Sequence, residues 1–187
     1  VKPTEWVMVN DGSNDGTDII VQQYVKIYPW IKLVSRQGYE VRQRGKGVIE
    51  AFYAGFETLT EKYDFIVKLD GDVSFEPTYF ESLLLKFDSD PQLGIAGGGL
   101  YERPNGKTWV LMTSKDHIRG CTKIYRKDCF DAIGGLVPAM GWDGIDEWTA
   151  FSLGWKVQSF YYLKVYHYRL TGAATGFLKS CVEQGYA

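Results

Sequence analysis

Strand-like and helix-like segments alternate over the first half of the chain. Residues 5–9, 31–34 and 65–69 are short apolar runs with the character of buried strands. Between them, over residues 20–27 and 48–59, apolar side chains recur every three or four positions, as they do along one face of a helix. This alternation predicts an α/β fold, in which a mostly parallel sheet is covered by helices on both faces.

The second half of the chain follows a less regular pattern. Residues 80–87 form a third amphipathic helical segment, and residues 126–133 indicate a short helix that ends at a glycine pair. Apolar runs at residues 93–96, 108–112 and 155–163 have strand character. We therefore expect a mixed extension of the α/β core in this half.

The length of the chain favours one domain. Its 187 residues, of which 45% are hydrophobic, supply enough apolar material for one core, so we expect residues 1–187 to form a single domain. The sequence begins almost directly in a strand. We expect that a preceding strand, and further segments at both ends, belong to the full protein.

Charge and cysteine content exclude several classes of protein. A net charge of −2 argues against a general nucleic-acid binder, which would carry a basic face. Cys121, Cys129 and Cys181 are odd in number and widely spaced, which indicates neither a zinc site nor a disulfide framework and favours a reducing compartment. No apolar run approaches the roughly 20 residues that span a bilayer.

Acidic residues follow two of the predicted strands. Asp11 and Ser13 lie in a loop after the first strand, and Asp70-Gly71-Asp72 follows the strand at residues 65–69. Ligands of open α/β sheets bind beyond the carboxyl ends of the strands, so we expect both segments at one edge. Two carboxylates around a glycine can converge on Mg²⁺ or Mn²⁺, and such ions keep phosphates in their shell. The alternative is an ordinary turn.

Three motifs in this order resemble the signature of family 2 glycosyltransferases. They are the segment from Val9 to Thr17, Gly45-Lys46-Gly47 before a helix, and Leu69-Asp70-Gly71-Asp72. The resemblance implies a GT-A fold, which is Rossmann-like, with a nucleoside-diphosphate-sugar as donor substrate. It also implies nucleotide contact by the loop that carries Asp11 and Ser13, with Asp11 on the nucleoside, and binding of metal and nucleotide-sugar by Asp70 and Asp72, with Asp72 the preferred metal ligand. Helix capping is the alternative role of Asp11 and Ser13.

Two further residues are candidates for the donor site. Lys46 lies at a glycine-rich helix start, where backbone N–H groups and positive charge favour phosphate, although a solvated basic surface is the alternative. His167 follows the last predicted strand, where some GT-A enzymes carry a histidine that completes the metal shell. A structural histidine among aromatic residues is the competing interpretation.

The catalytic base is expected in the segment from Gly141 to Glu147. Many members of the family have a Glu-Asp pair here, whereas this sequence has Asp143 and, three residues later, Asp146. In the family, the usual spacing between the base and a downstream glycine is closer to the spacing between Asp143 and Gly154, which favours Asp143. The acidic doublet Asp146-Glu147 at a helix start favours Asp146 instead. We prefer Asp146, as a helix cap that presents its carboxylate to the cleft. Such a carboxylate could take the proton of the acceptor hydroxyl as it attacks, which inverts the anomeric centre.

These resemblances imply an inverting sugar transfer to a hydroxyl acceptor in polysaccharide or glycolipid assembly. The expected partners are the donor and a glycan or lipid-linked acceptor, with no nucleic acid. We expect a cytoplasmic protein at the inner face of the membrane, attached peripherally through segments outside this sequence. The alternatives are a sugar-phosphate nucleotidyltransferase and a non-catalytic nucleotide- or glycan-binding module of the same fold.

Overall fold

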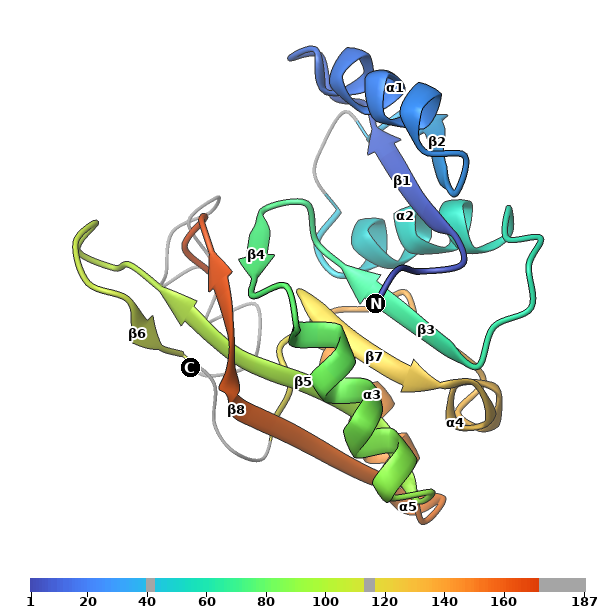
Figure 1. Ribbon diagram of the computed structural model, residues 1–187, viewed down its shortest axis with the longest axis vertical. Coiled ribbons are helices and arrows are strands. Elements are labelled where there is room, and N and C mark those ends of the chain that lie inside the picture. The colour runs from blue at the N-terminus through green and yellow to red at the C-terminus, as the bar shows by residue number, and fades with distance from the viewer. Residues whose placement is uncertain (40–42, 113–116, 172–187) are drawn as a thin grey trace. The chain divides into compact units, whose positions relative to one another are not determined.

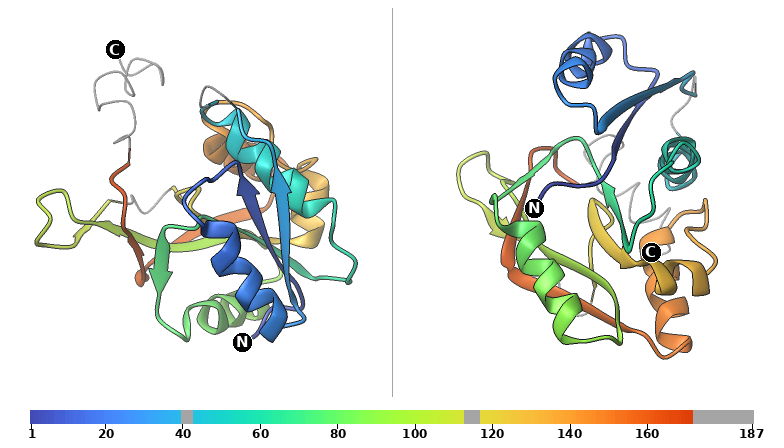
Figure 2. Two further views of the ribbon diagram at one scale, coloured as in Figure 1. Left: turned by 90° about the horizontal axis from the view of Figure 1, so that it is seen from above. Right: turned by 45° about the vertical axis from the view of Figure 1, so that its right-hand side comes forward.

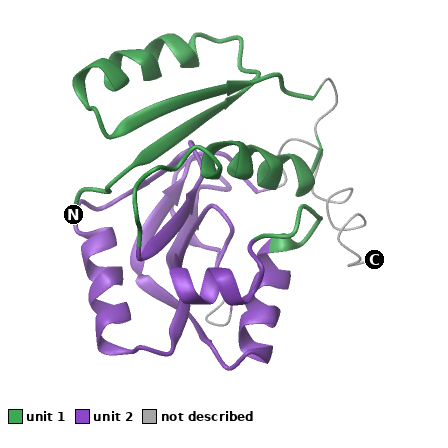
Figure 3. Cartoon of the chain, turned by 90° about the vertical axis from the view of Figure 1, so that its right-hand side faces the viewer, with its two compact units in different colours: residues 1–63, 136–142 green, residues 64–135, 143–187 purple. Residues whose placement is uncertain are grey.

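The computed structural model describes residues 1–39, 43–112 and 117–171 (Figure 1). The chain divides into two compact units (Figure 3). The first unit is Val1–Tyr63 with Leu136–Trp142, and the second is Asp64–Gly135 with Asp143–Ala187. The prediction that residues 1–187 form one catalytic domain stays a prediction. Among the helices of the described ranges, none is long and apolar enough to cross a bilayer.

The first unit is a strand–helix–strand unit followed by a second helix. Its elements are β1 (Trp6–Asp11), α1 (Thr17–Ile27), β2 (Ile31–Arg36) and α2 (Lys46–Phe56). The strands β1 and β2 pair in parallel, from Trp6 opposite Ile31 to Asp11 opposite Arg36. Helix α2 packs closely on β1, since a Cβ on Gly55 would lie 2.8 Å from Val9 Cγ2. The alternation predicted for this segment is confirmed.

The second unit contains the larger sheet. Its elements are β3 (Phe65–Leu69), β4 (Val73–Phe75), α3 (Tyr79–Ser89), β5 (Leu93–Glu102), β6 (Val110–Leu111), β7 (Thr122–Arg126), α4 (Lys127–Ala132), α5 (Trp142–Ser152) and β8 (Lys156–His167). The strand order is β3-β7-β5-β8-β4, and β6 pairs with β5. The first residue of α5, Trp142, is also the last residue of the first unit.

The mostly parallel pairing that we predicted is wrong for this sheet. Among the strand pairs that the structure describes in this larger sheet, only β5 and β8 run parallel, and the other pairs are antiparallel. Alternating strands and helices give parallel pairs where consecutive strands are neighbours, as β1 and β2 are. Strand β3 instead pairs with β7, which comes from much later in the chain.

A single apolar cluster holds the second unit together. Helix α3 packs on β5 and β8 and contributes Tyr79, Leu83 and Phe87, all of which are buried (Figure 2). The Tyr79 hydroxyl accepts a hydrogen bond from the backbone N–H of Gly98 at 2.8 Å and lies 3.1 Å from Thr122 Oγ1. Strand β5 carries glycines where α3 and neighbouring strands come close, and a Cβ on Gly98 would lie 2.6 Å from the Tyr79 ring.

Candidate functional site

The Asp11 loop lies at the carboxyl end of β1. Asp11 is the last residue of the strand, and its Oδ1 lies 3.0 Å from Arg36 Nε of β2. Ser13 donates its backbone N–H to Asn10 Oδ1 at 2.8 Å, which closes a turn. Neither residue caps α1, because Asp15 Oδ1 accepts both the N–H and the hydroxyl of Thr17. Arg36 neutralises Asp11, but nothing in the sequence around Arg36 indicated that it would pair with this aspartate.

Lys46 begins α2 after Gly45, which has a φ of 64°. Its ammonium group lies 3.5 Å from Glu50 Oε1, one helical turn away, and its side chain is 55% exposed. A side chain in this position can exchange a weak surface ion pair for a phosphate group. Its predicted role in phosphate binding stays a prediction. The same holds for the expectation that the Asp11 loop and the Asp70 turn share one edge.

Asp72 and His167 face each other in the second unit. Strand β4 pairs with β8 so that Val73 lies opposite His167, which brings Asp72 beside the histidine. His167 Nε2 lies 3.5 Å from Asp72 Oδ1, and this contact is the main cause that lowers the pKa of Asp72 and raises that of His167. Arg169 Nε lies 3.8 Å from the other carboxylate oxygen of Asp72.

A buried carboxylate holds the other side of the His167 ring. His167 Nδ1 lies 2.8 Å from Oε1 of Glu102, the last residue of β5. The Glu102 side chain is 2% exposed, and the same oxygen accepts hydrogen bonds from the backbone N–H and hydroxyl of Thr171. Sequence reasoning missed Glu102, because its partner lies far along the chain.

Asp70 has a different environment. Lys68 of β3, whose side chain is 5% exposed, contacts Asp70 Oδ1 and also donates to the carbonyl of Gly120 at 2.8 Å. The backbone N–H of Asp70 donates to the carbonyl of Cys121 at 2.9 Å. A buried lysine thus neutralises the first aspartate of the Asp70-Gly71-Asp72 motif.

The donor set of Asp70, Asp72 and His167 suits a divalent ion in its chemistry, since carboxylates and imidazole are ligands for Mn²⁺. Within the described ranges, no three or more such side chains are gathered closely enough to enclose an ion. Asp72 and His167 therefore form part of a candidate coordination shell for a metal ion, with its other positions left open. Ions that act on phosphates keep several positions for water and substrate oxygens, and a partial shell is compatible with that use.

The two candidate bases differ sharply in exposure. Asp143 lies in the first turn of α5, and its side chain is 27% exposed. Asp146 lies inside the helix with a side chain that is 1% exposed, and it accepts from Lys123 Nζ at 2.9 and 3.0 Å and from the Tyr125 hydroxyl at 2.5 Å. The expectation that Asp146 is a helix cap at the edge of the cleft is wrong, because the helix begins at Trp142.

The pKa values of the two aspartates move in opposite directions. Burial raises the pKa of Asp146, against the opposing effect of Lys123 and Tyr125. Burial also acts to raise the pKa of Asp143, but His117 and Lys123 outweigh it, and the pKa of Asp143 is lowered. Asp143 is therefore the accessible and more readily ionised carboxylate of the two.

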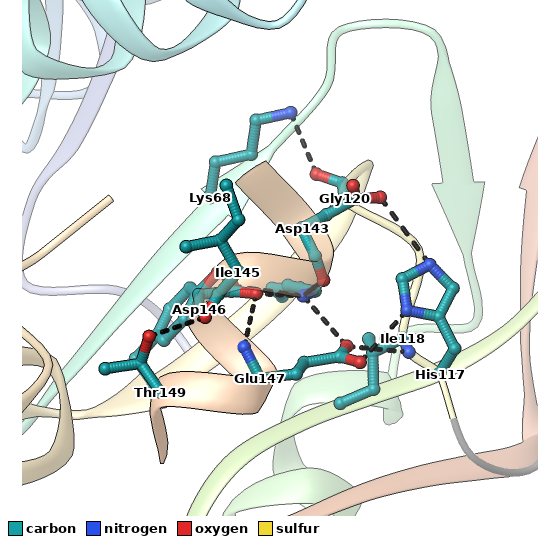
Figure 4. A network of polar contacts seen from close by, with 11 residues as sticks. Lys68, His117, Ile118, Gly120, Asp143, Ile145, Asp146, Glu147 and Thr149 are labelled. Carbon is teal, nitrogen blue, oxygen red and sulfur yellow. Dashed lines mark hydrogen bonds and ion pairs between the residues drawn. The ribbon is translucent and has the colours of Figure 1, made fainter. Parts of the chain in front are cut away.

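His117 and Glu147 complete this cluster (Figure 4). His117 Nδ1 lies 3.0 Å from Glu147 Oε2, and its Nε2 lies 3.6 Å from Asp143 Oδ2. Sequence reasoning assigned no role to His117 and none to Lys123, whose side chain is fully buried. They come from segments remote from α5, so no local spacing could have grouped them with Asp143.

Comparisons with known proteins agree with this architecture. The model of the family "Glycosyl transferase family 2" matches residues 1–141. YibD of Escherichia coli (strain K12), named as a glycosyltransferase, is 28% identical over 62% of this chain and 31% of its own length. EpsH of Bacillus subtilis (strain 168), which also carries a glycosyltransferase name, is 26% identical over 98% of this chain and 58% of its own length. The chain thus spans only part of these relatives.

Two solved structures share the fold. The mannosyltransferase PcManGT from Pyrobaculum calidifontis, solved with GDP-Man and Mn²⁺, has a TM-score of 0.62 and 17% identity, over 91% of this chain and 50% of that one. GalNAc-T7, solved with UDP, GalNAc and Mn²⁺, has a TM-score of 0.65 and 15% identity, over 90% of this chain and 38% of that one. The predicted GT-A fold is confirmed, and the family match shows that this chain belongs to the family 2 glycosyltransferases.

Proposed function

We propose that this protein transfers a sugar from a nucleoside-diphosphate-sugar to a hydroxyl acceptor with inversion, and that Asp143 is the general base. The observation that carries the proposal is the contrast within α5, where Asp143 is accessible and Asp146 is enclosed by Lys123 and Tyr125. A base must reach the acceptor proton directly. This favours Asp143 over Asp146, which we preferred from the sequence.

In this mechanism Asp143 accepts the proton of the acceptor hydroxyl as that oxygen forms a bond to the anomeric carbon. The bond from the anomeric carbon to the diphosphate oxygen breaks on the opposite face, and the nucleoside diphosphate leaves with that electron pair. The contacts with His117 and Lys123 lower the pKa of Asp143, which keeps it ionised and ready to accept the proton.

In this proposal the donor is held by the residues predicted from the sequence. Asp11 contacts the nucleoside, Lys46 contacts the phosphates, and Asp72 with His167 and Asp70 would hold a Mg²⁺ or Mn²⁺ ion. When bound there, such an ion would offset the negative charge that develops on the leaving diphosphate. The contact between Asp72 and His167 supports this assignment. So do the ligands of the structural relatives, which are GDP-Man and Mn²⁺ in PcManGT and UDP, GalNAc and Mn²⁺ in GalNAc-T7. Ser13 shapes the Asp11 loop through its bond to Asn10.

The acceptor is a glycan or lipid-linked hydroxyl in polysaccharide or glycolipid assembly. The proposed location is the cytoplasm, at the inner face of the membrane, with attachment through parts of the longer protein. The family match supports the proposed acceptor, and the partial coverage of the relatives leaves room for an attachment segment outside this sequence.

The test compares Asp143→Asn and Asp146→Asn in a protein with both ends extended to the length of its relatives. Nucleoside diphosphate release is measured with a panel of nucleotide-sugars, Mn²⁺ and candidate acceptors. We expect Asp143→Asn to lower kcat by about 10²–10⁴-fold, the usual loss when a general base is removed. The donor KM should change little, because Asp143 faces the acceptor, and NMR of the product should show the inverted anomer.

Asp131→Asn is a matched control, since Asp131 lies in α4 of the same unit and its ion pair with Lys127 is exposed. Its kcat should equal that of the unaltered protein. The assignment is overturned if Asp143→Asn keeps full kcat while Asp146→Asn folds and is inactive.

A further inference from the structure

We propose that His117 and Glu147 are positioning residues for Asp143, with His117 as a cationic clamp on one carboxylate oxygen and Glu147 as the buried anchor of that clamp. The inference rests on the proposed function, because it gives Asp143 the role of base. The mechanism above uses His117 only to lower the pKa of Asp143, and it gives Glu147 no role.

The clamp follows from the spacing along α5. Asp143 and Glu147 are one helical turn apart and therefore share a face of the helix. His117 lies between them, with Nδ1 3.0 Å from Glu147 Oε2 and Nε2 3.6 Å from Asp143 Oδ2 (Figure 4). The imidazole thus bridges an enclosed carboxylate and an accessible one.

Glu147 is a rigid anchor. Its side chain is 5% exposed, and its Oε1 accepts the backbone N–H of Ile118 at 2.9 Å. The same oxygen lies 2.9 Å from Lys123 Nζ of β7. Lys123 also contacts the backbone carbonyl of Asp143 and the carboxylate of Asp146, which ties the first turn of α5 to the sheet. Each partner of Glu147 is therefore fixed by further contacts.

The charges around His117 favour its protonated form. Asp143 and Glu147 face the ring from α5, and Lys123 faces Glu147 from β7 with Asp146 beside it. The carboxylates of Asp146 and Glu147 both contact Lys123, which can neutralise only one of them, and a protonated His117 offsets further negative charge from Glu147 and Asp143. The contacts with Asp143 and then with Glu147 raise the pKa of His117 to about 9, against the opposing effect of burial.

Such a clamp supplies what a general base needs. Holding one oxygen of Asp143 restricts rotation of the carboxylate, and misplacement of a reacting group by about 1 Å can cost roughly 10²-fold in rate. The positive charge also keeps Asp143 ionised beside a negatively charged donor. Without His117, the carboxylate would rotate freely and its pKa would rise.

The direct test is an NMR titration of ¹⁵N-labelled histidine in the full-length protein. Within residues 1–187 the sequence has 2 histidines, so His117→Gln identifies the signal of His117. We expect His117 to titrate near pH 9 and its pKa to fall toward 6.5 in Asp143→Asn and in Glu147→Gln. Lys127→Gln, which breaks the exposed pair with Asp131, should leave the titration unchanged.

Kinetics provide the second readout. His117→Gln should lower kcat by about 10–100-fold with an unchanged donor KM, and should move the acidic limb of the pH–rate profile to higher pH. A His117 signal that titrates near pH 6.5 in the unaltered protein overturns the proposal. So does a pKa of His117 that stays the same in Asp143→Asn. Failure of the base assignment looks different, because Asp143→Asn would then be fully active while the NMR coupling persists.

Discussion

At the scale of single residues, the contact between Asp72 and His167 depends on the register in which β4 pairs with β8. Pairing of Val73 with His167 across β4 and β8 brings the carboxylate to the histidine, and Glu102 holds the far side of the ring. A histidine whose Nδ1 bonds a carboxylate turns its Nε2 toward a metal in a fixed orientation. Glu102 is therefore the outer support of the proposed ion site.

Metal affinity gives a prediction for this pair. Asp72→Asn and His167→Ala should each weaken Mn²⁺ binding in the presence of UDP or GDP, because each removes a donor atom. Glu102→Gln should weaken it by about 10–100-fold, the usual effect of losing an outer-shell partner. Electron paramagnetic resonance of free Mn²⁺ measures all three, with Asp131→Asn as the control. Equal affinity in all variants would contradict an ion site here.

The sequence predicted the acidic residues but not their cationic partners. Asp72 and Asp143 stood out because they follow glycine-marked turns in a recognisable order. Lys68, Lys123 and His117 did not, since a charged residue inside a strand or a loop looks the same whether it is solvated or buried against a carboxylate. Only the tertiary pairing of β3, β7 and α5 brings them to their partners.

At the scale of elements, strand β5 is longer than its sequence pattern indicated. The prediction covered residues 93–96, whereas the strand runs to Glu102 through three consecutive glycines. Glycine has low strand propensity, so pattern alone ended the strand too early. The structure shows why glycine is needed, because the Tyr79 side chain of α3 and backbone atoms of β8 occupy the space that a Cβ on Gly98 would take.

Two glycine substitutions should therefore have opposite effects. Gly98→Ala should lower the free energy of unfolding by about 1–3 kcal/mol, because its Cβ would meet the Tyr79 ring and the backbone of Leu163. Gly144→Ala should raise it by up to about 1 kcal/mol, since Gly144 lies in α5 with nothing within 4 Å of an added Cβ. Urea denaturation measures both, and a stable Gly98→Ala would contradict the packing of α3.

At the scale of the whole molecule, each unit contains a group that links stability to pH. In the first unit, Lys32 and then the backbone N–H of Glu61 lower the pKa of Glu5 to about 2, despite burial. In the second, Asp143 and Glu147 raise the pKa of His117 to about 9. The stabilising contribution of Glu5 is lost as pH falls, and that of His117 is lost as pH rises.

The melting temperature should show both effects. The Glu5 contribution is complete above pH 4.5 and disappears as pH falls through about 2. The His117 contribution is complete below pH 6.5 and disappears as pH rises through about 9. Calorimetry across this range should find the highest melting temperatures between the two windows. Glu5→Gln should reduce only the fall in melting temperature at acidic pH, and His117→Gln should reduce only the fall at alkaline pH. The reverse pattern would refute the assignment of these two pH dependences to Glu5 and His117.

The first unit consists of two separate stretches of the chain, and this affects when its contacts can form during synthesis. Residues 136–142 belong to it, and Tyr53 of α2 exchanges two hydrogen bonds with the backbone of Leu136. Nascent domains generally fold from the N-terminus as they leave the ribosome. Here the first unit gains its contacts with residues 136–142 only after translation has passed through β7 and α4. A ribosome stalled before residue 136 would therefore display a first unit that still lacks the two hydrogen bonds between Tyr53 and Leu136.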